Sequence, residues 1–76
     1  MNNTRRAELN TIRTKLENLM SKLTEIAEQE ENAFDNLPEG LQIAARGAAI
    51  EEAVENLNSA IDALDEAINY IDDAMV

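Results

Sequence analysis

The chain has 76 residues, no cysteine, no histidine and a formal charge of −10, and these features exclude several classes of function. A chain of this length forms at most one small domain, and it lacks the cysteines that could stabilise a small core through a disulfide or a metal site. Its negative charge argues against binding the nucleic-acid backbone, which requires a basic face. We expect a single domain over residues 1–76.

The first predicted element is an amphipathic helix over about residues 4–35. Its apolar residues recur at alternating spacings of three and four, the pattern of a helix with one apolar seam: Leu9, Ile12, Leu16, Leu19, Leu23 and Ile26. Three more apolar residues widen this stripe on one side: Met20, Ala27 and Phe34. Glu30 takes the next seam position, which predicts a water-exposed tip with Arg46 as a possible partner.

A connection is predicted over about residues 36–42, where the breakers Pro38 and Gly40 stand close together. One helical turn could lie inside it. A short connection between two long amphipathic helices predicts an antiparallel helical hairpin.

The second long helix is expected over about residues 43–75. Its apolar seam has no gap: Ile43, Gly47, Ile50, Val54, Leu57, Ile61, Leu64, Ile68, Ile71 and Met75. Beside the seam, alanine recurs every seven residues: Ala53, Ala60, Ala67 and Ala74. One step earlier this column reaches Arg46, a cation where the pattern otherwise places a methyl group.

The charges also favour an antiparallel pairing. Residues 1–26 carry five cations and three acids, a net +2, while residues 27–76 carry thirteen acids and one cation, a net −12. A register in which paired residue numbers sum to about 85 places Arg13 near Asp72 and Phe34 near Glu51.

Both apolar faces are too wide for two helices alone, which predicts a homo-oligomer. The simplest assembly is an all-α four-helix bundle made by two copies, although a larger ring or a heterologous partner helix would also cover the faces. The residues expected at the oligomer interface are Leu16, Leu23, Val54, Leu57, Ile61, Leu64 and Ile68.

The sequence carries no motif for catalysis. There is no P-loop, no glycine-rich dinucleotide fingerprint and no nucleophile–base set, because histidine and cysteine are missing. The acids of the second helix match no metal-binding loop and are interpreted as a solvated face. We expect no enzyme, no metal and no cofactor. The chain has no apolar run long enough to span a membrane and no signal-peptide core, so we expect a cytoplasmic protein.

The region around the connection gives the most specific hypothesis of a site. Gly47 is expected to leave a space in the core, and Arg46 stands beside it near a helix N-terminus, where an anion is favoured. The predicted ligand-binding residues are Arg46, Gly47, Phe34, Gln42 and Glu30, which suit a phosphate and a base. In the alternative interpretation, Gly47 only allows close helix approach and Arg46 only pairs with Glu30 or Asp35.

The segment NLPEGLQ at residues 36–42, then Arg46 and Gly47, then a helix rich in Glu, Ala, Ile and Leu, resembles a family of small helical-hairpin proteins of phages and mobile elements. The resemblance covers roughly residues 30–76. It implies an anti-defence protein in the cytoplasm of a bacterial host.

Three functions remain open at this point. The first is sequestration of an anionic, nucleotide-like immune signal at the tip or at a subunit interface. The second is an acidic protein-interaction module that covers a basic surface of a host CRISPR or restriction protein. Its acidic face would comprise Glu51, Glu52, Glu55, Asp62, Asp65 and Glu66. The third is a structural coiled-coil component.

Overall fold

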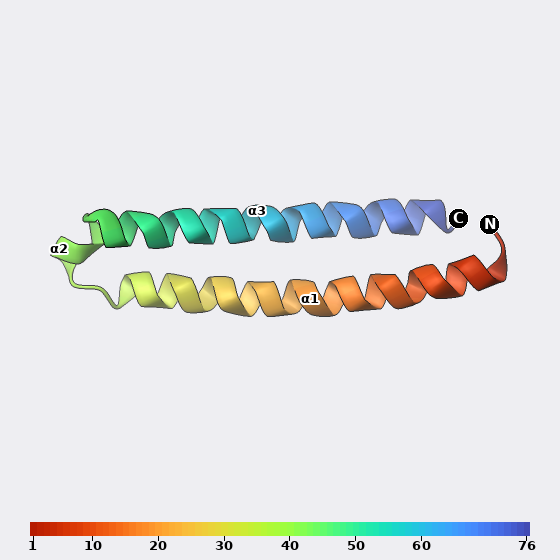
Figure 1. Cartoon of the computed structure of the whole chain (residues 1–76), viewed down its shortest axis with the longest axis horizontal. Helices are drawn as coiled ribbons and strands as arrows, with labels where there is room; N and C mark the ends of the chain where they lie inside the picture. The colour runs from red at the N-terminus through yellow and green to blue at the C-terminus, as the bar shows by residue number, and fades with distance from the viewer.

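The computed structural model describes all 76 residues and contains three helices and no strand. Helix α1 spans Asn3–Asp35, α2 spans Glu39–Gln42 and α3 spans Ala45–Ala74. The all-α fold class is thus confirmed. The molecule is elongated, with extents of 58 × 15 × 12 Å. Figure 1 shows α1 and α3 side by side and running in opposite directions, with α2 at the turn and both termini at the other end.

The chain turns a corner between α2 and α3, where the sequence predicted the start of the second helix. Ile43 caps the C-terminus of α2, and Ala44 has an extended backbone that precedes the first turn of α3. Ile43 is therefore 90% exposed, and its expected place in the apolar seam is wrong. The seam of α3 begins at Gly47 instead.

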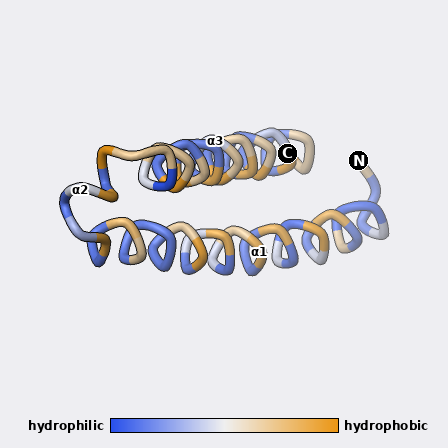
Figure 2. Tube along the Cα trace, turned by 60° about the vertical axis from the view of Figure 1, so that its left-hand side comes forward, coloured by the Kyte–Doolittle hydropathy of each residue, from blue (hydrophilic) through white to orange (hydrophobic).

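From Gly47 to Met75, every predicted seam residue of α3 is buried or half-buried. On α1 the covered residues have the same alternating spacing of four and three: Leu9, Arg13, Leu16, Met20, Leu23, Ala27, Glu30 and Phe34. Figure 2 shows hydrophobic residues recurring with each turn along both long helices. A single layer of side chains between α1 and α3 therefore forms the core.

The observed seam of α1 differs from the predicted one. Ile12, Leu19 and Ile26 are 46%, 51% and 47% exposed, so they lie outside the contact with α3. The column that includes Arg13 and Met20 takes their place. The predicted column and the observed column lie on opposite sides of the same leucines, so helical spacing allows either of them to face α3. The ion pair between Arg13 and α3 is consistent with the column that the structure places there.

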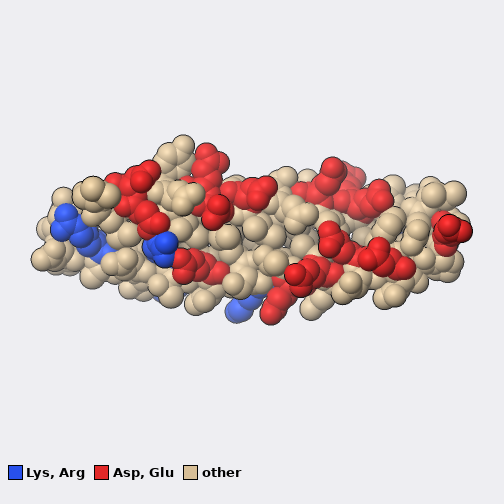
Figure 3. Space-filling model, turned by 180° about the vertical axis from the view of Figure 1, so that it is seen from behind, with Lys and Arg blue, Asp and Glu red and all other residues tan.

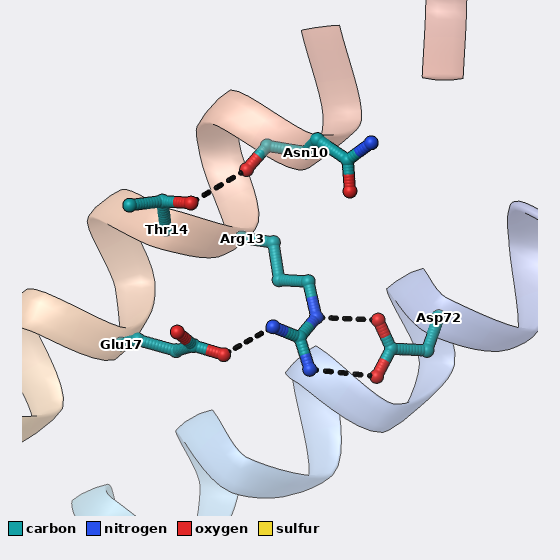
Figure 4. Close-up of polar contacts among 5 residues, drawn as sticks. All are labelled: Asn10, Arg13, Thr14, Glu17 and Asp72. Carbon is teal, nitrogen blue, oxygen red and sulfur yellow. Dashed lines mark hydrogen bonds and ion pairs between the residues drawn. The ribbon is translucent and has the colours of Figure 1, made fainter. Parts of the chain in front are cut away.

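Arg13 joins the two long helices through a bidentate ion pair with Asp72 (Figure 4). Its Nε donates to Oδ1 of Asp72 at 2.5 Å and its Nη2 donates to Oδ2 at 3.1 Å, while Nη1 donates to Glu17 one turn along α1. The two residue numbers sum to 85, the predicted register. The hydrogen bond from Arg13 lowers the pKa of the Asp72 carboxyl, and the same bond raises the pKa of the guanidinium.

Side chains also bind backbone carbonyls at both ends of the helix pair. At the terminal end, Nε of Arg6 donates to the carbonyl oxygen of Met75 at 3.0 Å. At the turn, Nε2 of Gln42 donates to the carbonyl oxygens of Phe34 and Leu37, both at 3.2 Å. The carbonyls of Leu37 and Met75, which follow α1 and α3, thereby gain a donor, and the carbonyl of Phe34 gains one in addition to the backbone N–H of Leu37.

We predict that Asp72→Asn lowers the melting temperature at neutral pH and that this difference disappears in acid. Because the folded-state pKa of Asp72 lies below its ordinary value of 3.8, its stabilising effect is present above that value and is lost as the pH falls through the folded pKa. Thermal unfolding followed by circular dichroism between pH 7 and pH 2 measures the difference. Asp73→Asn removes the neighbouring acid, which forms no ion pair, and is the matched control.

Candidate functional site

The larger of two hollows on the protein is a groove of about 450 Å³ next to the turn of the chain; the other, of about 370 Å³, lies beside Asn10, Thr11, Thr14 and Lys15 and has no hydrophobic residue in its lining. The larger groove lies between the last turns of α1 and the first turns of α3. We call it the acidic groove, and its lining consists of Glu31, Phe34, Asp35, Ile50, Glu51, Val54 and Glu55.

Helical spacing explains how each helix presents its share of the groove. On α1, Glu31 precedes Phe34 and Asp35 by three and four residues, so the three side chains share one face. On α3, Ile50 and Val54 are likewise four residues apart. The groove brings Phe34 and Glu51 together, as the predicted register of about 85 requires. The ring and the two aliphatic side chains form its apolar part.

All four charged residues of the groove are acids, and no lysine or arginine lines it. Figure 3 extends this pattern over one face of the molecule, where acids alone occupy the half towards α2 and the basic side chains gather nearer the termini. This potential repels anions and attracts cations. The acids are nevertheless spread out, because no group of three or more potential metal ligands comes close enough to hold one ion.

Arg46 does not belong to this groove. The residue is exposed, and its side chain forms neither a hydrogen bond nor an ion pair. The predicted pairs with Glu30 and Asp35 are therefore wrong. Glu30 is half-buried in the layer between α1 and α3 rather than placed at a water-exposed tip, and Asp35 lines the groove.

Gly47 and Gln42 hold the turn together rather than framing a cavity. A Cβ atom on Gly47 would lie 2.1 Å from the carbonyl oxygen of Gln42, so the backbone of α2 fills the place where the sequence predicted a space. The predicted space is thus wrong, and the alternative of close approach is confirmed. Gln42 has its side-chain amide engaged by Phe34 and Leu37. Of the five predicted ligand-binding residues, the groove contains only Phe34.

Sequence reasoning missed most of the residues that line the groove. It named Glu51 and Glu55, but as parts of an outer acidic face. A usable signal was present, because the predicted register already placed Phe34 opposite Glu51. Adding residues three and four positions away on each helix would have found most of the lining, including Glu31, Val54 and Glu55.

The seven residues predicted at an oligomer interface lie in or beside the layer between α1 and α3 of one chain. All are half-buried except Ile68, which is buried. Contact of these residues with another copy remains a prediction. No helix is both long and apolar enough to span a bilayer.

Comparison with protein-family models, with curated proteins and with solved structures finds no match to this chain. The resemblance to phage helical-hairpin proteins therefore remains a prediction, and the interpretation of the site depends on its geometry.

We predict opposite effects for alanine at the two glycines. Gly47→Ala should destabilise the protein by roughly 1–3 kcal/mol, because the new methyl group overlaps the backbone of Gln42. Gly40→Ala is the control: no atom lies within 4 Å of the new methyl group, and the loss of flexibility in the unfolded chain should stabilise the protein by about 0.4–1 kcal/mol. Urea unfolding of both variants measures the difference. Equal stability of the Gly47→Ala variant and the parent would contradict the close contact.

Proposed function

We propose that this chain is a non-catalytic protein-interaction module whose acidic groove binds a basic segment of a partner protein. The observation that carries the proposal is the composition of the groove, in which four carboxylates surround Phe34, Ile50 and Val54 and no cation is present. A lysine or arginine of the partner would meet the carboxylates with its charge while its aliphatic stem covers the apolar part.

The charge of the whole molecule supports the same kind of partner. With 16 acids against six cations, the protein attracts a basic surface over a distance of about 8–10 Å at physiological salt. A nucleic-acid-binding surface of a host defence protein has this character, which connects the groove with the anti-defence role implied by the resemblance.

Sequestration of an anionic nucleotide has less support. The one cation expected to hold a phosphate, Arg46, lies outside the groove, and Gly47 leaves no space for a base. An anion in the groove would face four carboxylates. We therefore favour a basic protein partner over a nucleotide.

We further infer that the helical hairpins assemble as a homo-oligomeric helix bundle, most simply a dimer with four long helices. Support comes from the burial pattern, because only Ala27, Gly47 and Ile68 are buried in the single chain. Oligomerisation is one of the means by which small domains compensate for a small core.

We predict that a fluorescein-labelled peptide rich in lysine and leucine binds the protein and that salt weakens the binding. The double variant Glu51→Lys/Glu55→Lys reverses two groove charges and should reduce affinity at least tenfold, since close charge pairs control such contacts. Fluorescence anisotropy at 50 and 300 mM salt measures both effects.

The matched control for this experiment is Glu25→Lys/Glu28→Lys, which changes the net charge equally on the exposed outer side of α1. It should reduce affinity only a few-fold. Equal losses in the two double variants would mean that net charge alone attracts the peptide, and the assignment of the groove would fail.

We also predict that a panel of mono-, di- and cyclic nucleotides neither binds nor reacts. Calorimetric titration should show no heat of binding, and nucleotides incubated with the protein should be recovered intact after denaturation. Saturable binding that Arg46→Ala abolishes would replace our proposal with sequestration. A cleaved product whose yield rises with protein concentration would show an enzyme.

A further inference from the structure

The structure leaves one column of large apolar side chains on α1 without a partner. Ile12, Leu19 and Ile26 follow one another at intervals of seven and remain about half exposed. Because seven residues are close to two helical turns, the three side chains form one stripe along α1. Isolated exposed residues are ordinary, but a stripe of this kind indicates a surface that another chain covers.

The alanine column of α3 lies on the same side of the helix pair. Every residue of the two columns is followed in the sequence by a residue of the core layer: Leu19 is followed by Met20, and Ala67 by Ile68. In two right-handed helices that run antiparallel, positions that precede the core residues fall on one common side. The stripe of α1 and the alanines of α3 therefore form a single apolar face.

The two columns are also level with each other along the long axis. Arg13 and Asp72, which are in direct contact, have numbers that sum to 85. Facing members of the columns have numbers that sum to 86, so a large residue of α1 stands level with an alanine of α3 at each of three heights: Ile12 with Ala74, Leu19 with Ala67, and Ile26 with Ala60.

The molecule as a whole exposes more surface than a compact monomer of its mass. The chain exposes 5524 Å², whereas a compact monomer of 8.4 kDa exposes about 4,600 Å² by the usual scaling with mass. The excess of roughly 900 Å² is close to the ~800 Å² that each partner buries in a standard protein interface.

We propose that a second copy of this chain covers this face, with α1 of each copy on α3 of the other and with both turns at the same end. This proposal specifies the face and orientation of the bundle inferred above. In this arrangement, Ile12, Leu19 and Ile26 of one copy pack on Ala74, Ala67 and Ala60 of the other. Large side chains thus meet small ones at every level, which permits dense packing.

This orientation has a consequence for the proposed function. Both acidic grooves would open at the same end of the dimer, so one dimer would present two sites to a partner with repeated basic segments. Two linked sites bind more tightly than one through effective concentration. The dimer itself is tested independently of the groove, because its test requires no ligand.

Single-cysteine variants test the orientation, because the parent chain has no cysteine. Leu19→Cys and Ala67→Cys proteins are mixed, unfolded, refolded together and oxidised with oxidised glutathione. The expected product is a disulfide-linked heterodimer of the two variants. Leu19→Cys alone should give little dimer, because the two copies of residue 19 lie diagonally across the bundle. Asn18→Cys mixed with Ala67→Cys is the control, since Asn18 is exposed and points away from the face.

Two outcomes would overturn the proposal. Efficient cross-linking of Leu19→Cys with itself, as strong as in the mixture, would show that α1 packs on α1 with the turns at opposite ends. Sedimentation equilibrium of the parent protein at micromolar concentration should give twice the chain mass of 8.4 kDa. A folded monomer under those conditions would exclude the second copy, whatever the outcome for peptide binding.

Discussion

The structure depends on one layer of side chains between two long helices. Two helices enclose a core only along the line where they meet, so most of this layer is half-buried and only Ala27, Gly47 and Ile68 are buried. The elongated shape and the open apolar side follow from the same constraint. Larger bundles bury the opposite sides of their helices as well. In this chain those sides stay exposed, and the proposed second copy would cover one of them.

The packing of the turn determines which side chains beside it remain available to contact a ligand. Close packing of Gly47 on the backbone of Gln42 brings α2 against the start of α3, and the amide of Gln42 binds carbonyls at the end of α1. These contacts use the glycine and the glutamine for structure. The side chains left beside the turn are mainly apolar or acidic, so the groove is suited to cations although the sequence drew attention to the arginine nearby.

The sequence predicts the helical fold and the core positions of α3 well, because the repeat from Gly47 to Met75 has no gap and admits one phase. In α1, two different columns of residues can complete an apolar seam together with the same leucines. The correct one includes Arg13, a charged residue that hydropathy alone does not assign to a core. The site was harder to predict, since Gly47 is equally compatible with a cavity and with close backbone contact. Only the path of α2 distinguishes these two possibilities.

The proximity of the chain ends has a consequence for how this fold can be built. The side chain of Arg6 reaches the carbonyl oxygen of Met75, and Figure 1 shows both termini at the same end of the pair. A short glycine–serine linker could therefore close the chain into a ring, with new ends opened at the exposed turn. The same proximity would allow two tandem copies in one polypeptide to form the bundle when their turns lie together. Copies with opposed turns would need a linker that crosses most of the 58 Å length.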